Sequence, residues 1–234
     1  MPTSSQTVLL LSGGLDSAVT LGMLHAEGRT VHALTVEYGQ RHAVELARAR
    51  ALASHYGVAH RTVTVDLRAL GGSALTDEID VPKDRQPGAG GIPATYVPAR
   101  NTILLSLALA WAEVVNAGAI AIGVNAVDYS GYPDCRPEYL TAFRQLTRLA
   151  TRMGVETGSG VDVIAPLSGL NKAEIIRRGV ALGVPLALTH SCYDPVGDLA
   201  CGRCDSCRIR RNGFEAAGVP DPTRYAASQA AVGL

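Results

Sequence analysis

The sequence lacks the features of a membrane or secreted protein. Its longest mainly apolar run, residues 103–115, contains Ser106 and Glu113 and is too short to span a bilayer. No basic stretch precedes the short apolar run at residues 8–11, as a secretory leader would require. We therefore expect a cytoplasmic protein that has no membrane partner.

The sequence also has no net excess of positive or negative charge, and it has few aromatic side chains. Lys and Arg together number 21, as do Asp and Glu, and aromatic residues make up 5% of the chain. Proteins that bind nucleic acid by neutralising phosphates or by stacking on bases need more of both. The composition therefore argues against a nucleic acid partner. Its 47% of apolar residues is ordinary for a folded globular chain.

Strand-like apolar runs alternate with helical segments along most of the 234 residues. This alternation indicates βαβ units, which form a parallel sheet with helices on both faces. We predict an α/β fold with a doubly wound, Rossmann-like parallel sheet over residues 1–189. A small zinc-binding segment, 190–234, is expected to pack on the same domain. The expected strands are 8–12, 31–38, 61–67, 119–124 and 161–166, and the expected helices are 16–27, 42–56, 101–116, 137–153 and 171–182.

Two stretches lack such a pattern. Residues 70–99 are rich in Gly and Pro, and a loop of this length in a compact domain is typically a lid, a binding loop or a disordered segment. The chain from residue 190 onward reads as turn-rich and contains four of the five cysteines. Since ligands of such sheets bind where strands end, the motifs that follow strands are the informative ones.

The first such motif is Ser-Gly-Gly-Leu-Asp-Ser at residues 12–17, between a strand and a helix. Its glycines permit a tight turn whose N–H groups converge on an anion, and the helix N-terminus adds partial positive charge. Asp16 would repel a bare phosphate, so its position suggests Mg²⁺ between the two. The alternative is a plain tight turn that is capped by Asp16 and Ser17. The motif has neither the Walker A lysine nor the dinucleotide fingerprint.

This motif resembles the pyrophosphate loop of the N-type ATP pyrophosphatases. The resemblance implies that ATP is cleaved between its α- and β-phosphates and that AMP is transferred to a substrate oxygen. The ATP-binding residues it implies are Leu11, Ser12, Gly13, Gly14, Leu15, Asp16 and Ser17.

Four cysteines, with the spacing C-x8-C-x2-C-x2-C, form the second motif. Disulfides are not expected in a reducing cytoplasm. Four thiolates at this spacing suit a closed, tetrahedral and therefore structural zinc site, with an iron–sulfur cluster as the alternative. The arginines around it form either a solvated patch or one that faces phosphate, and nearby His190 is expected to be structural or to line the site. The ligands are Cys192, Cys201, Cys204 and Cys207.

Two further segments, 96–101 and 123–138, are polar or aromatic and contain Pro. In the first, Tyr-Val-Pro-Ala-Arg-Asn, Arg100 is placed to meet a phosphate or carboxylate, although an ordinary surface arginine fits equally well. The second, Gly-Val-Asn-Ala-Val-Asp-Tyr-Ser-Gly-Tyr-Pro-Asp-Cys-Arg-Pro-Glu, follows an expected strand, where a binding loop belongs.

With Lys-Ala-Glu-Ile-Ile at 172–176 and the cysteine cluster, these segments resemble the 7-cyano-7-deazaguanine synthase (QueC) family over about residues 8–214. The resemblance implies an ATP-dependent ligase of queuosine biosynthesis. Such an enzyme converts 7-carboxy-7-deazaguanine and ammonia into 7-cyano-7-deazaguanine (preQ0) through an adenylated acid and an adenylated amide. It also suggests a homodimer. We find no glutaminase-like segment, so free ammonia is the expected nitrogen source.

On this interpretation Arg100 binds ATP, and Asp16, Ser17 and Lys172 are catalytic, although a solvated helix lysine is an equal alternative for Lys172. We expect Asp128 or Asp134 to accept the two N–H groups of a guanine-like ring. Cys135 is expected to be a buried pocket cysteine rather than a nucleophile. The full set of expected substrate-binding residues is Asp128, Tyr132, Asp134 and Arg136.

Two other protein classes share part of the pattern. A tRNA-modifying enzyme, or an NAD or GMP synthetase of the same fold, would share residues 12–17, but residues 128–138 argue against it. A non-enzymatic zinc ribbon gives no account of residues 12–17.

Overall fold

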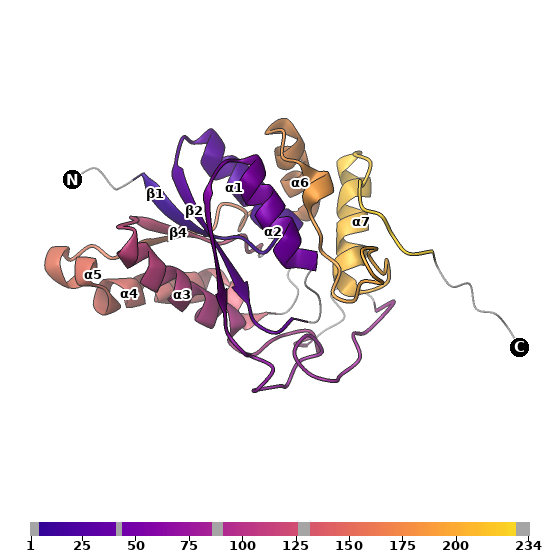
Figure 1. The fold of residues 1–234 in the computed structure, drawn as a ribbon, viewed down its shortest axis with the longest axis horizontal. Coiled ribbons are helices and arrows are strands. Elements are labelled where there is room, and N and C mark those ends of the chain that lie inside the picture. Colours follow the sequence, from indigo (N-terminus) through magenta and orange to yellow (C-terminus); the bar gives the residue numbers. More distant parts are fainter. Residues whose placement is uncertain (1–4, 41–43, 86–90, 126–131, 228–234) are drawn as a thin grey trace, which may run out of the picture.

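The computed structural model describes residues 5–40, 44–85, 91–125 and 132–227. In these ranges five parallel strands form one sheet in the order β3-β2-β1-β4-β5 (Figure 1). The chain proceeds outward from β1 to β3 and then restarts at β4, so the switch point lies between β1 and β4. The predicted fold class is confirmed. The strands are β1 (Gln6–Leu10), β2 (Thr30–Glu37), β3 (Ala59–Thr64), β4 (Ala119–Ala121) and β5 (Asp162–Ile164).

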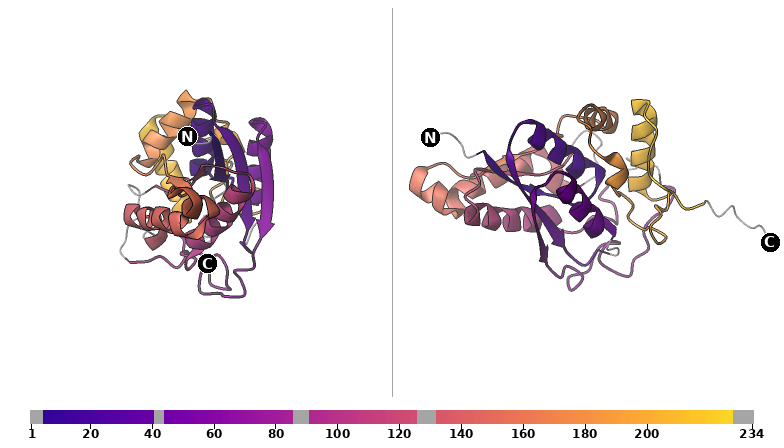
Figure 2. Two further views of the ribbon diagram at one scale, coloured as in Figure 1. Left: turned by 90° about the vertical axis from the view of Figure 1, so that its left-hand side faces the viewer. Right: turned by 45° about the horizontal axis from the view of Figure 1, so that its top comes forward.

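Helices cover both faces of the sheet (Figures 1 and 2). On one side α1 (Leu15–Ala26) and α2 (Val44–His55) pack against the sheet, α6 (Lys172–Ala181) packs against α1, and α7 (Asp205–Ala217) packs against α6. On the other side α3 (Arg100–Val114) and α4 (Pro137–Ala150) pack against the sheet, and the short α5 (Arg152–Thr157) packs against α4. Two 3₁₀ helices, η1 (Pro133–Cys135) and η2 (Leu186–Leu188), complete the described elements.

Strand β1 shows why the sequence reads as continuous apolar runs. Val8 and Leu10 belong to the apolar cluster under α3 and α4, whereas Leu9 belongs to the cluster under α1 and α6. All three side chains are buried. A strand that is covered on both faces needs apolar residues at every position rather than at every second one.

Two predicted helices differ from the structure at their ends. The helix expected at 137–153 is two helices, because Thr151 is extended and its side chain accepts a hydrogen bond from the Gly154 N–H, which starts α5. The helix expected to be capped by Asn101 begins at Arg100 instead. Its N-cap position is Ala99, in the left-handed region at φ 52°.

The expectation that the chain from residue 190 onward is turn-rich is wrong for α7. The buried positions of α7 are Cys207, Arg210, Gly213 and Phe214, and a cysteine and an arginine on the inner face conceal its helical period. A Cβ on Gly213 would lie 2.4 Å from Cγ of Lys172, so glycine lets α7 approach α6. The predicted boundary between 1–189 and 190–234 stays a prediction.

The described parts of the 70–99 loop, residues 70–85 and 91–99, contain no helix or strand. The Ala74 N–H donates to the Ala94 carbonyl oxygen at 2.7 Å, which closes the loop near its base. Further along, Lys83 pairs with Cys204 in an isolated antiparallel bridge. The loop therefore extends from the end of β3 to the cysteine cluster. Within the described ranges, none of the helices is long and apolar enough to cross a bilayer.

Candidate active site and metal centre

A cavity of about 310 Å³ opens at the carboxyl edge of the sheet, beside the switch point. Its walls come from the ends of β1, β2 and β4, from the first turns of α1, α3 and α6, and from α7. A pocket of this size at this place in a doubly wound fold is the expected ligand site. The predicted site residues that line it are Leu11, Ser12, Gly14, Leu15, Asp16, Ser17, Arg100, Tyr132, Lys172 and Cys192.

The loop between β1 and α1 forms one wall of the cavity. The Ser12 and Ser17 hydroxyl oxygens lie 3.1 Å apart, and the Gly14 N–H donates to the Ser12 hydroxyl at 3.2 Å. The Ser17 hydroxyl also reaches the Gly14 carbonyl at 3.1 Å. These contacts hold the turn at the N-terminus of α1, where helix N–H groups favour an anion.

Two glycines allow other elements to approach this loop. Gly13 has φ +84°, and a Cβ there would lie 2.4 Å from the Glu45 carbonyl oxygen on α2. A Cβ on Gly123, just after β4, would lie 3.0 Å from the backbone N of Ser17. A larger residue at either position would displace the loop from its neighbours.

Lys172 and Asp16 meet in the cavity. The Lys172 Nζ lies 2.8 Å from both carboxylate oxygens of Asp16, and the two side chains are 15% and 28% exposed. Lys172 is the first residue of α6, which begins with a capping box that joins Asn171 and Glu174. The cap therefore fixes the start of α6, and with it a cation, beside the loop at residues 12–17.

Arg100 lies among tyrosines on the opposite wall. Its guanidinium carbon is 5.9 Å from the ring centres of both Tyr38 and Tyr132. Burial opposes its charge, but the nearby phenol groups of Tyr38, Tyr132 and Tyr193 raise the pKa of Arg100 above its ordinary value. Its Nε is buried without a hydrogen-bond partner among the described residues. Burial raises the pKa of Glu45, which also lines the cavity, to about 7.

The remaining expected substrate residues lie apart from one another. Asp134 is buried outside the cavity lining, where its carboxylate accepts the Asn101 N–H at 2.9 Å and so caps α3. Cys135 lines the cavity, receives a hydrogen bond from the Asn101 side chain, and has a pKa that burial raises to about 11. Arg136 is exposed, and Asp128 lies outside the described residues.

The four cysteines form a compact cluster whose sulfur atoms all lie within 4.8 Å of one another. A tetrahedral site with Zn–S bonds of about 2.3 Å separates its sulfurs by roughly 3.8 Å, and the Cys201 and Cys207 sulfurs are 4.0 Å apart. Backbone N–H groups point at these sulfurs, from Cys201 to Cys192 at 3.1 Å and from Cys204 to Cys201 at 3.3 Å. The cluster therefore fits a four-coordinate metal ion held by thiolates.

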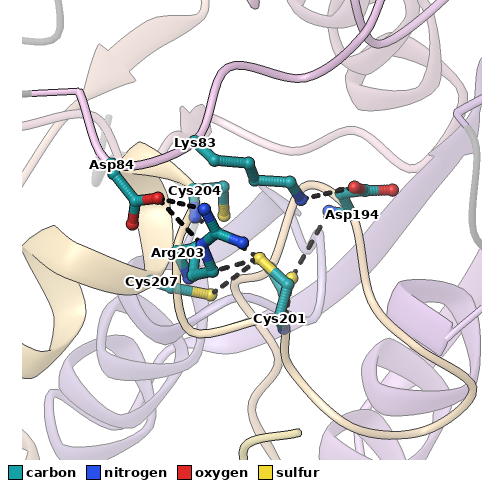
Figure 3. A network of polar contacts seen from close by, with 8 residues as sticks. Lys83, Asp84, Asp194, Cys201, Arg203, Cys204 and Cys207 are labelled. Atoms are coloured by element: carbon teal, nitrogen blue, oxygen red, sulfur yellow. Dashed lines mark hydrogen bonds and ion pairs between the residues drawn. The ribbon is translucent and has the colours of Figure 1, made fainter. Parts of the chain in front are cut away.

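Charged residues from the 70–99 loop lie against this cluster (Figure 3). Lys83 forms an ion pair with Asp194, next to Cys201. Arg203 forms one with Asp84, its Nε lying 2.8 Å from the carboxylate, and the Asp84 N–H donates to the Arg203 carbonyl oxygen at 2.9 Å. The cysteine cluster and its neighbours therefore anchor the middle of this loop.

Comparison with known proteins identifies the family. The family model described as queuosine biosynthesis protein QueC matches residues 6–218. The chain belongs to the QueC family. This family member is 60% identical over 225 residues to the 7-cyano-7-deazaguanine synthase of Xanthomonas campestris pv. campestris strain B100, a match that covers 95% of this chain and 99% of that one. It is also 60% identical over 227 residues to the enzyme of the same name from Myxococcus xanthus strain DK1622, covering 95% and 98%.

A solved structure of NMN synthetase from Francisella tularensis resembles this QueC family member in fold. The two align with a TM-score of 0.51 at 18% identity, which covers 94% of this chain and 79% of that one. An identity this low shows only that the fold is shared. The expected family membership is nonetheless confirmed by the match over residues 6–218 and by the relatives at 60% identity.

Sequence reasoning did not single out two of the charged residues that line the cavity of this QueC family member. Glu45 stands on a helix with a weak apolar stripe and belongs to no motif. Arg210 was noted only as one of several arginines around the cysteines, yet it is 3% exposed and lines the cavity. The one available signal was its spacing, one helical turn after Cys207.

Proposed function

We propose that this chain acts as a 7-cyano-7-deazaguanine synthase, an ATP-dependent carbon–nitrogen ligase of queuosine biosynthesis. It converts 7-carboxy-7-deazaguanine and ammonia into 7-cyano-7-deazaguanine (preQ0). One observation carries the proposal: the loop at residues 12–17 and the Lys172–Asp16 pair share one cavity, in a chain that is 60% identical to proteins of that name over nearly its whole length.

The first half-reaction overcomes the poor electrophilicity of a carboxylate. An oxygen of the acid attacks the α-phosphate of ATP, pyrophosphate leaves, and the acyl carbon becomes activated as its adenylate. Ammonia then displaces AMP and forms the amide. The loop N–H groups, the hydroxyls of Ser12 and Ser17, Lys172 and Arg100 stabilise the negative charge on the phosphates during the attack.

The second half-reaction removes the remaining oxygen. The amide oxygen attacks a second ATP and releases a second pyrophosphate. Loss of AMP and a proton from the adenylated amide leaves the carbon–nitrogen triple bond. Each nitrile formed therefore consumes two ATP and one ammonia and releases two AMP and two pyrophosphates.

Recognition of the deazaguanine ring requires an acceptor for two adjacent N–H groups. The Asp134 carboxylate already accepts the Asn101 N–H at the start of α3. That leaves Asp128, from the same segment, as our candidate for the ring, with Tyr132 as an aromatic neighbour in the cavity. Asp128→Asn is expected to weaken binding of the acid, whereas Asp134→Asn is expected to leave it within about twofold of the parent, since neutral amides still accept hydrogen bonds.

We assign one structural Zn²⁺ per chain to Cys192, Cys201, Cys204 and Cys207, because four thiolates close its coordination shell. When ATP is bound, Mg²⁺ offsets the charge between the phosphates and the Asp16 carboxylate. We further propose that the chain is a cytoplasmic homodimer that uses free ammonia and has no nucleic acid partner.

Oxygen tracing tests this function. The purified protein is supplied with Mg²⁺, ATP, ammonium and the acid labelled with ¹⁸O in both carboxyl oxygens. The proposed route transfers each label to a different AMP, so mass spectrometry should find two singly labelled AMP for every nitrile. Omission of ammonia is the control, and it should abolish nitrile formation.

Release of ADP and orthophosphate would contradict α-phosphate chemistry. Nitrile formed with only one labelled AMP would contradict the second adenylation while leaving the first intact. No ATP turnover with the acid and ammonia both present would remove the proposed function altogether.

A further inference from the structure

Arg210 lies where the cysteine cluster meets the candidate active site. Helix α7 begins directly after Cys204 and carries Cys207 in its first turn. Arg210 follows one turn later on the same side of the helix. It is 3% exposed and contributes to the cavity lining together with Ser191. One short helix, with Cys204 at its N-cap and Cys207 in its first turn, therefore connects the cysteine cluster to a buried cation beside the cavity.

The guanidinium of Arg210 joins two chain segments. Its Nε donates to the Asp221 carboxylate at 3.0 Å, and both side chains are buried or nearly so. Its Nη1 donates to the Thr189 hydroxyl at 2.8 Å and to the Ser191 hydroxyl at 3.4 Å. Its Nη2 is buried without a partner among the described residues. A phosphate oxygen would satisfy this remaining donor.

The segment that Arg210 holds reaches the phosphate loop. Ser191 follows His190, whose backbone N–H donates to the Gly13 carbonyl oxygen at 3.0 Å. The next residue along this segment is Cys192, a member of the metal cluster. The cluster therefore fixes residues 189–192 and α7 at one end, and Arg210 connects them again at the edge of the cavity.

We propose that Arg210 is a positioning residue through which metal binding at the four cysteines sets the phosphate-binding loop. With the metal in place, α7 and residues 189–192 keep a fixed separation. Arg210 then bonds to Thr189 and Ser191, and this holds Gly13 in the geometry that binds ATP. The inference rests on the proposed function, because it takes the loop at residues 12–17 to be an ATP site.

The test needs variants that spare the metal and the fold. Arg210→Lys keeps a positive charge beside Asp221, but a single ammonium cannot replace the planar fork that also reaches Thr189 and Ser191. The double variant Thr189→Val with Ser191→Ala leaves the Arg210–Asp221 pair intact and removes the two hydroxyls that accept from Nη1 of Arg210. It also removes the bond from the Thr189 hydroxyl to the Leu186 carbonyl. Arg178→Met is the control, since Arg178 is an exposed arginine on α6, away from the cysteine cluster and from the bonds of Arg210.

Calorimetric binding of the Mg²⁺ complex of α,β-methylene-ATP, which resists cleavage at the reactive bond, reports the coupling. We expect both test variants to raise Kd by about tenfold, the effect of losing hydrogen bonds to a charged group. Elemental analysis should find unchanged metal content, and the control should bind like the parent. Hydrogen exchange should become faster in residues 11–18 and stay unchanged in β3.

Metal removal completes a cycle. Stripping the metal from the parent should raise Kd by about the same factor as Arg210→Lys, whereas stripping it from Arg210→Lys should add little, because the connection is already broken. If circular dichroism shows that the metal-free protein is unfolded, the test depends on the Kd of the metal-loaded Thr189→Val, Ser191→Ala variant alone.

An unchanged Kd in that double variant, or metal loss from Arg210→Lys, would overturn the proposal. The proposal would also be overturned if metal removal and Arg210→Lys raised Kd independently, so that the combined increase equalled the product of the two separate increases. If any of these results is found while the parent protein turns over ATP, only this coupling is contradicted. A parent that binds no analogue contradicts the proposed function.

Discussion

Lys172 Nζ lies 2.8 Å from both oxygens of the Asp16 carboxylate, although 156 positions separate the two residues in the chain. The pair is largely shielded from water and stands at the N-terminus of α1. On the proposed function, this cation would neutralise Asp16 before ATP binds and would then be available to the phosphates of ATP. The pairing explains how a carboxylate is tolerated at the N-terminus of α1, beside a loop that we propose binds phosphates.

Replacing Lys172 by Met should lower kcat/KM for ATP by about a hundredfold, because it removes a preorganised positive donor at the phosphate chain. Lys172→Arg should retain part of the rate. AMP release measured by chromatography provides the readout, and Arg178→Met, at an exposed position of α6, is the control. Rates of Lys172→Met within twofold of the parent would show that Asp16 and the phosphates do not need this cation.

Gly13→Ala should destabilise the protein more than Gly28→Ala, although both glycines have positive φ, +84° and +70°. Each substitution carries a backbone cost of about 1 kcal/mol. Only at Gly13 would the added Cβ also meet backbone, the Glu45 carbonyl oxygen at 2.4 Å, whereas nothing lies within 4 Å at Gly28. Overpacking typically adds 1–3 kcal/mol, roughly, so urea titration should separate the variants by at least about 1 kcal/mol. Equal decreases in the free energy of unfolding for the two variants would mean that α2 moves away from the added Cβ at little cost.

Removal of the metal should lower the midpoint of thermal unfolding, because four thiolates without their ion repel one another and no longer crosslink the segments that carry them. We expect one zinc per chain by elemental analysis. Cys201→Ser should lower both the zinc content and the midpoint, and Cys135→Ser is the matched control that should retain both. Visible absorption from iron in the freshly purified protein would favour the iron–sulfur alternative instead.

Cys135 should be a slow thiol. Burial raises its pKa to about 11, so the reactive thiolate is scarce at neutral pH. In the metal-loaded protein, its alkylation rate should therefore rise about tenfold per pH unit between roughly pH 7 and 10. Mass spectrometry of the peptide that contains Cys135 measures this rate, and denatured protein supplies the reference. Turnover should persist in Cys135→Ser. Loss of turnover in this variant would instead support the hypothesis that Cys135 is a nucleophile.

Glu45 should make stability depend on pH. Burial raises its pKa from 4.5 to about 7, so the folded protein binds this proton more tightly than the unfolded chain does. The stability this group contributes is full below about pH 4.5 and is lost as pH rises through about 7. Glu45→Gln removes the dependence, so its free energy of unfolding relative to that of the parent should increase by roughly 2–3 kcal/mol from pH 5 to pH 8.

Thermal unfolding of both proteins across this pH range makes the comparison, with Glu215→Gln, on α7 at an exposed position, as the control. A constant difference between parent and Glu45→Gln would show that Glu45 titrates normally. A difference that grows in the opposite direction would show that Arg100 outweighs burial.

Local patterns in the sequence were enough to predict the strands and most of the helices, and to single out the loop at residues 12–17 and the four cysteines. Apolar runs and helical periods placed all five strands and most helices, since both depend on neighbouring residues. The prediction of a four-cysteine metal site followed from ligand type and spacing, and the structure brings all four sulfurs together. Helix α7 escaped because its buried face carries Cys207 and Arg210 rather than apolar residues alone.

The sequence by itself determined the parallel α/β fold, the strand–turn–helix setting of residues 12–17 and the cluster of four cysteines, because each depends on contiguous or closely spaced residues. Only the tertiary structure decided that Lys172 meets Asp16, that Asp134 caps α3, and that Arg210 reaches the cavity from the metal centre. Those contacts depend on strand order and helix packing, which bring together residues that no local pattern relates. The shifted pKa of Glu45 has the same origin, since burial is a property of the assembled fold.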